Sequence, residues 1–153
     1  MKINLSKKQY RQLLLMSNIA NHVLGILGDM VSEEDYKELS DEAMSLESYL
    51  MGFAKDFQAD DLVEEFEGRV IPNETHHQEA IMPIMEDYDE ENFFSTLVNR
   101  LAWRDFRRDH SEGEMEAMAK KNGGYFGVEI HSCEEKYRKE FEKHGVERVE
   151  VGK

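Results

Sequence analysis

The stretch NETHHQE, residues 73–79, holds two of the 6 histidines in this chain of 153 residues, next to acidic side chains. With a helix beginning near Asn73, Glu74 and His77 stand three residues apart. This Glu-x-x-His spacing lets two ligands on adjacent turns reach one ion in di-metal helix bundles. Such a centre needs a second motif and further inward carboxylates, and the chain has no second Glu-x-x-His. We expect a solvated or capping segment here, with a divalent metal site at Glu74 and His77 as the alternative.

A second polar group lies in the first predicted helix, where Asn18, His22 and Asp29 share one arc at about 100° per residue. Gly25 and Gly28 fall near the same arc, and neither Lys nor Glu does. This face therefore either packs closely against another helix or lines a pocket. An imidazole in such a place could titrate near neutral pH, whereas the structural alternative is that Asn18 and His22 satisfy neighbouring polar groups.

The segment FFSTLVNRLAWRDFRRDH carries the best interaction signal. Four arginines and the single tryptophan gather on one predicted helix, and tryptophan and arginine are enriched at binding hot spots. Its candidate partner-binding residues are Arg100, Trp103, Arg104, Arg107 and Arg108. There are two alternatives to a docking surface. In the first, the arginines pair with acids of the middle segment and another helix covers Trp103. The second is nucleic-acid binding, which four arginines without a wider basic patch support only weakly.

No complete catalytic set accompanies these residues. The chain has no nucleophile elbow, phosphate loop, dinucleotide fingerprint or paired-cysteine motif, and its single cysteine, Cys133, is expected to be an inert thiol. The sequence therefore leans against an enzyme and predicts no cofactor beyond the possible divalent metal.

The elements that must position these side chains are predicted to be helices. Ser6 and Gln9 form a capping box for a helix to about Asp29, and Ser32 begins a second helix. From Tyr36 to Phe57, apolar residues recur at alternating spacings of three and four, which is typical of a heptad seam closed either within a bundle or between subunits. Asn73 or Thr75 caps a later helix, Ser111 begins another, and Pro83 predicts a kink or break. Residues 125–130 and 146–151 favour a minor β-hairpin near the C-terminus.

The charge of −14 is concentrated in the middle of the chain. Residues 31–91 hold 20 acids and 3 bases, whereas residues 1–30 hold 4 bases and 1 acid. Such an acidic segment repels nucleic acid and anionic membranes, so binding to either is disfavoured. The same segment raises the hypothesis of an acidic nucleic-acid mimic that occupies a basic partner.

The sequence thus predicts one all-α domain over residues 1–153, a compact bundle of five or six helices. The lone cysteine and the interrupted N-terminal apolar patch favour a soluble cytoplasmic protein without a membrane span. We expect it to act through protein contacts, as an adaptor, a regulator or a self-associating structural protein. The alternatives are a metal-binding carboxylate/histidine helix-bundle enzyme and the nucleic-acid mimic.

Overall fold

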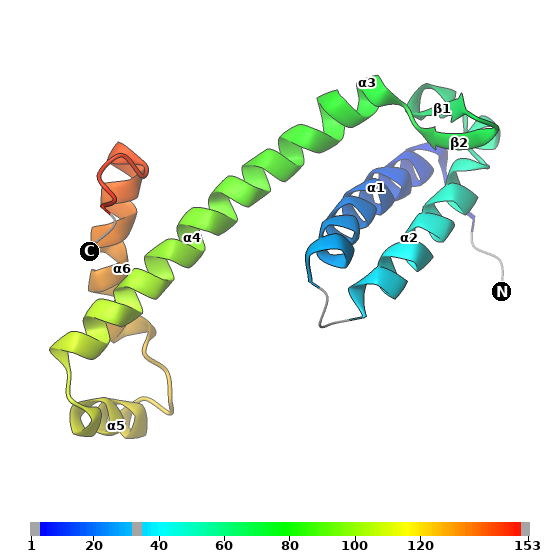
Figure 1. The fold of residues 1–153 in the computed structure, drawn as a ribbon. Coiled ribbons are helices and arrows are strands. Elements are labelled where there is room, and N and C mark those ends of the chain that lie inside the picture. The colour runs from blue at the N-terminus through cyan, green and yellow to red at the C-terminus, as the bar shows by residue number, and fades with distance from the viewer. Residues whose placement is uncertain (1–3, 32–34, 151–153) are drawn as a thin grey trace. The chain divides into compact units, whose positions relative to one another are not determined.

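The computed structural model describes residues 4–31 and 35–150, which fold mainly as α-helices joined by turns (Figure 1). The predicted all-α class is confirmed. Contacts divide the chain into two units, Met1–Asp87 and Tyr88–Lys153, and each unit has a core of its own. The boundary between the units falls within helix α4, and the prediction of a single domain stays a prediction.

The first unit is a pair of long helices followed by a small hairpin. Its elements are α1 (Lys7–Met30), α2 (Tyr36–Met51), the 3₁₀ turns η1 (Lys55–Phe57) and η2 (Asp60–Leu62), the strands β1 (Val63–Phe66) and β2 (Arg69–Pro72), the short helix α3 (Glu74–His76), the π-turn η3 (His77–Ile81) and the start of α4 (Met82–Asp109). The second unit contains the rest of α4, then α5 (Glu112–Lys121) and α6 (Gly127–His144).

Three helix starts follow from local capping. The Ser6 side chain accepts from the backbone N–H of Gln9, whose own side chain accepts from the Ser6 N–H, so the predicted capping box of α1 is confirmed. Ser111 and Glu114 form the same box for α5. Asn73 caps α3 by accepting from His76. Ser32, the predicted start of the second helix, lies outside the described residues.

The β-hairpin lies in the middle of the chain, so its predicted place near the C-terminus was wrong. Strand β1 pairs antiparallel with β2, from Val63 opposite Pro72 to Phe66 opposite Arg69. Glu67 and Gly68 both have positive φ, as a tight two-residue hairpin turn requires. Most of residues 125–130 begin α6 instead, because Ile130 is buried against the second core.

A π-turn precedes Pro83 and makes room for it. Proline has no N–H and its ring clashes with the carbonyl four residues earlier, here that of Glu79. Residues His77–Ile81 widen into π geometry, and α4 then continues from Met82 without ending at the proline. The disturbance predicted at Pro83 is therefore a local widening of the helix, without a break.

Helices α1 and α2 run side by side in opposite directions (Figure 1), and their contact has a dry end and a polar end. At the dry end, Tyr10 stacks on Phe57 with ring centroids 4.2 Å apart, and its hydroxyl donates to the Leu50 carbonyl at 2.6 Å. The core around it contains Tyr10, Leu14, Met51, Ala54, Ala59 and Leu62. Burial of these side chains stabilises the fold by roughly 25 cal/mol per Å² of apolar surface removed from water.

At the polar end, small side chains let the two backbones approach each other. A Cβ added at Gly28 would lie 3.2 Å from the Tyr36 carbonyl oxygen and 3.3 Å from the Ser40 Cβ. Ser40 is buried against this contact. The glycine-bearing arc of α1 therefore packs against α2, as one of the two sequence alternatives predicted.

Only part of the predicted heptad seam of residues 36–57 is packed, since Leu50 and Phe57 lie against the core around Tyr10. The helix ends at Met51, and its buried side chains are Ser40, Glu47 and Met51. Every second seam position, namely Leu39, Leu46 and Phe53, is exposed. Apolar spacing alone thus located only part of the contact, because α2 meets apolar residues of α1 at one end and the polar arc of α1 at the other.

Replacing each glycine of α1 by alanine distinguishes two effects on stability, the gain in helix propensity and the loss of close packing against α2. No atom of the described residues lies within 4 Å of a Cβ added at Gly25, so Gly25→Ala should stabilise the protein by about 0.5–1 kcal/mol. Gly28→Ala must push α2 away, and we expect it to be less stable than Gly25→Ala by about 1–3 kcal/mol in urea unfolding followed by circular dichroism. Equal stabilities would contradict the close α1–α2 contact.

Candidate functional site

A polar pocket of about 390 Å³ lies at the polar end of the α1–α2 contact. Helix α1, helix α2, the end of β2 and the π-turn all contribute to it. Its lining residues are Asn18, Asn21, His22, Gly25, Ile26, Asp29, Ser40, Met44, Glu47, Pro72 and His77. Asn18, His22 and Asp29, which the sequence placed on one arc, thus share one pocket, and Asn18 is buried.

Glu47 is the buried acid of this pocket and is only 5% exposed. The Asn18 amide donates to one of its carboxylate oxygens at 2.5 Å, and the Asn21 amide donates to the other at 2.7 Å. Burial raises the pKa of Glu47, while the two amides and the nearby His77 lower it in part. The carboxylate therefore joins two helices through a pair of hydrogen bonds that cross the interface.

The two histidines of the pocket come from different elements. The rings of His22 on α1 and His77 on the π-turn have centroids 6.0 Å apart. Glu74, the proposed metal partner of His77, is exposed and accepts a hydrogen bond from Gln78. Within residues 4–31 and 35–150, no three His, Cys, Asp or Glu side chains are grouped to hold a metal ion. The metal hypothesis for Glu74 and His77 stays a prediction.

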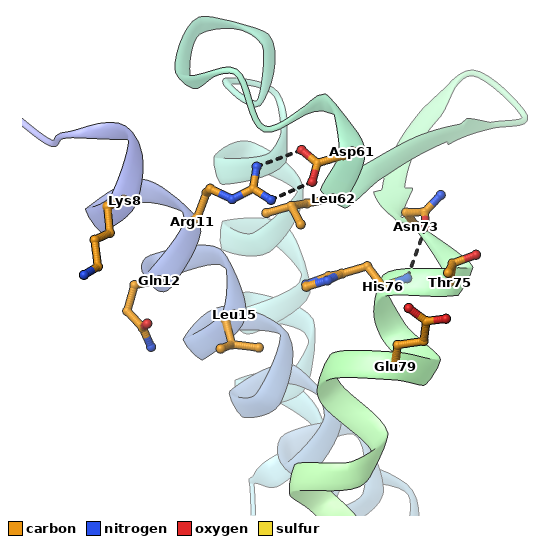
Figure 2. A pocket seen from close by; sticks show the side chains of 10 residues that line it. All are labelled: Lys8, Arg11, Gln12, Leu15, Asp61, Leu62, Asn73, Thr75, His76 and Glu79. Atoms are coloured by element: carbon orange, nitrogen blue, oxygen red, sulfur yellow. Dashed lines mark hydrogen bonds and ion pairs between the residues drawn. The ribbon is translucent and has the colours of Figure 1, made fainter.

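A second pocket, of about 640 Å³, lies between the N-terminal half of α1 and the hairpin region (Figure 2). The Arg11 guanidinium holds Asp61 through two hydrogen bonds of 2.7 and 2.5 Å, which lowers the pKa of Asp61. In Figure 2 the His76 ring points toward α1. Lys8, Gln12, Leu15, Leu62, Asn73, Thr75 and Glu79 complete the lining.

The pKa of His76 is lowered in this second pocket. Burial is the main cause that lowers the pKa of His76, and the positive Arg11 acts in the same direction. Its Nε2 is buried, and none of the described residues forms a hydrogen bond with it. This imidazole and an arginine already paired with an aspartate do not form an assembled nucleophile or acid/base pair, so this pocket does not indicate a reaction class.

The arginine and tryptophan helix is largely engaged within the second unit. Trp103 is half-buried, lies edge-on to Phe106 and Phe126, and has the Arg107 guanidinium over its ring at 5.5 Å. Arg104 donates to the Tyr137 hydroxyl on α6 at 2.9 Å. The remaining candidates, Arg100 and Arg108, are exposed on α4. The internal explanation therefore accounts for Trp103, Arg104 and Arg107, although their partners come from α4, α6 and the residue before α6, not from the acidic middle segment.

Asp105 is the charged centre of this helix pair. It accepts hydrogen bonds from Arg104, from Lys136 at 3.3 Å and from the Tyr137 hydroxyl. The Tyr137 hydrogen bond, followed by that of Arg104, lowers the pKa of Asp105 to about 2. Since Lys136 and Tyr137 lie on α6, this carboxylate joins α6 to α4.

The outer side of α1 is an unusual surface of the first unit because it carries exposed apolar side chains. The residues away from its packed arc are apolar: Met16, Ile19, Val23, Ile26, Leu27 and Met30, here called the outward apolar face of α1, with Ile26 at its edge beside the polar pocket. Met16, Ile26 and Met30 are 58%, 45% and 80% exposed, and the other three are half-buried. Exposed contiguous apolar surface of this kind marks interaction sites in soluble proteins.

Among the described residues, α1 is also the one helix that is long and apolar enough to cross a membrane. Packed helices of soluble proteins and N-terminal signal sequences have the same length and hydropathy, so these properties do not place α1 in a bilayer.

Comparisons with models of protein families, with curated proteins and with solved structures found no match for this chain.

Glu47 is the residue of the polar pocket that sequence reasoning missed. A glutamate within a segment of 20 acids looks like one more solvated charge. The available signal was indirect: Ser40 and Glu47 stand seven residues apart on one face of the second helix, and the first helix presented an uncharged amide-rich arc in need of a polar partner.

Glu47→Gln should remove part of the pH dependence of the free energy of unfolding of the first unit. Because folding raises the pKa of Glu47, the folded state binds its proton more readily, and the free energy of unfolding should rise as the pH falls toward the unfolded pKa of about 4.3. Urea unfolding between pH 8 and pH 4.5 should show this rise in the native protein and a smaller one in Glu47→Gln. Glu42→Gln, at an exposed acid of the same helix, is the control and should behave like the native protein.

Asp105→Asn should destabilise the second unit at neutral pH. The contribution of Asp105 to the free energy of unfolding falls as the pH falls, whereas that of Glu47 rises. Folding lowers the pKa of Asp105 to about 2, so its contribution is present above the unfolded value of about 3.9 and is lost as the pH falls through 2. Trp103 fluorescence reports unfolding of this unit. The native protein should exceed Asp105→Asn in urea midpoint at pH 6, and the two should converge near pH 2. Asp109→Asn, on the exposed side of α4, should match the native protein at both values.

Proposed function

We propose that this protein acts through protein–protein contacts and that the outward apolar face of α1 is its main binding surface. The observation that supports this proposal is the inverted packing of α1. Its amide and glycine arc packs against α2, while the outward apolar face has three exposed residues, Met16, Ile26 and Met30, and three half-buried ones. A helix of a globular domain normally buries its apolar stripe, so an exposed one calls for a partner.

The chemistry of this face suits a protein partner. Residues 12–28 contain no Lys, Arg, Asp or Glu, so a partner can cover the face without removing a charge from water. Methionine is prominent in it, and its flexible thioether side chain adapts to irregular apolar surfaces.

The exposed stripe of α2 is the weaker candidate surface. Leu39, Leu46, Tyr49 and Phe53 follow one line along the helix, but Glu42 interrupts that line. Covering this stripe would bury a carboxylate, which costs free energy unless the partner supplies a cation. The arginine and tryptophan helix ranks below α1 as well, since Trp103 already packs against Phe106 and Phe126.

A photo-crosslinking amino acid at Met16 tests the proposal without assuming the partner. Irradiation in cells that make the protein should join Met16 to another protein chain, either a second copy or a different protein. The same amino acid at Val128, an exposed apolar position on α6, is the matched control and should give far less product. A crosslink confined to the same chain, or none at all, would contradict the proposal.

A further inference from the structure

We infer that the partner on the outward apolar face of α1 is a second copy of this chain, with the two α1 helices packed antiparallel about a twofold axis near Val23. This inference rests on the proposed function and names its partner. A twofold interface uses the same patch on both subunits, so the patch must complement itself.

The outward apolar face meets that requirement in its composition. It is apolar along its length and uncharged from residue 12 to residue 28, so two copies can meet without opposing like charges. The helix is about 36 Å long at 1.5 Å per residue, enough for an extended helix–helix contact.

The ends of the helix favour the antiparallel arrangement. Lys7 and Lys8 make the N-terminal end of α1 basic, whereas Arg11 is already paired with Asp61. At the other end, Asp29 lies beside the start of α2, where Lys37 bridges Asp29 and Asp41 and where Asp35 and Glu38 add further acids. Antiparallel packing brings each basic end near the acidic end of the other copy, and it also opposes the two helix dipoles favourably. Parallel packing would place like charges together.

The charge of the chain also favours a second copy over a membrane surface as the partner of this face. The two helices of the unit share a polar contact through Glu47, and the chain from residue 31 to residue 91 holds 20 acids and 3 bases. Anionic lipid surfaces repel such a segment. A second copy requires no contact between the acidic segment and an anionic surface.

Light scattering coupled to size exclusion is the first test. The native protein should have twice the mass of one chain. Met16→Glu with Met30→Glu should be monomeric, because in the antiparallel pair each new carboxylate faces another, and the dissociation constant should rise on the order of 100-fold. Val128→Glu with Val146→Glu, at exposed apolar positions of the second unit, is the matched control and should stay dimeric. Circular dichroism shows that each variant is folded.

A charge-swapped variant tests the direction of packing. Met16→Lys with Met30→Glu places opposite charges together only if the helices are antiparallel. It should therefore be mainly dimeric under conditions in which the double glutamate variant is monomeric. Equal dissociation of the two variants would overturn the antiparallel arrangement.

Disulfide trapping tests the antiparallel arrangement independently, because a disulfide forms only between positions that lie close together. With Cys133→Ser as the background, Met16→Cys plus Met30→Cys in one chain should form a covalent dimer on mild oxidation. The two positions lie about 21 Å apart along the helix, too far for a bridge within one chain. Met16→Cys alone should not crosslink, and efficient crosslinking of this single variant would show parallel packing and overturn the proposal.

The remaining outcomes distinguish this inference from the proposed function. A native protein that stays monomeric at 100 μM overturns the second copy as partner. If Met16 still crosslinks to a different protein, the proposed function stands and only the inference fails. Sedimentation of the monomer with vesicles of phosphatidylcholine, lost in Met16→Glu with Met30→Glu, would assign the face to lipid and overturn both.

Discussion

The carboxylate of Glu47, held by two asparagine amides of α1, is the interaction on which the arrangement of the first unit depends. A buried carboxylate without donors would cost more free energy than the surrounding packing returns. The two hydrogen bonds are possible only if α1 turns its amide arc toward α2. Once that arc is inward, helical geometry turns the apolar arc outward. The polar pocket and the apolar surface are therefore two results of the same constraint.

Buried polar contacts of this kind favour one helix register over others more than they add stability. A pair of uniformly apolar faces can slide by a turn at little cost, whereas Glu47 meets both Asn18 and Asn21 in only one register. Gly28 and Ser40 act in the same sense, since the backbones can approach closely only where both side chains are small. The first unit thus fixes its two helices by polar and steric matching at one end and by apolar packing around Tyr10 at the other.

The parts of this fold that could be predicted depend on residues close together in sequence. The capping pairs Ser6–Gln9 and Ser111–Glu114 and the cap Asn73 specify helix starts because their hydrogen bonds span three residues. The predicted polar arc of Asn18, His22 and Asp29 also proved to line one pocket. Glu47 could not be assigned in this way, because its burial depends on a helix some thirty residues away. The hairpin was missed for a related reason: a glycine in a tight turn and a glycine after a helix look alike in sequence until the pairing of β1 with β2 is known.

The π-turn before Pro83 sets the rotation of the two neighbouring histidines about their helix axis. A π-turn carries one residue more than an α-turn, so side chains before it are rotated by about 100° relative to a continuous α-helix. With this rotation, His77 lines the pocket of Glu47 while His76 lines the pocket of Arg11. Loss of one residue between 78 and 80 would restore α-helical phase and turn both imidazoles to new directions. The length of this short segment, as much as its composition, therefore decides which pocket each histidine enters.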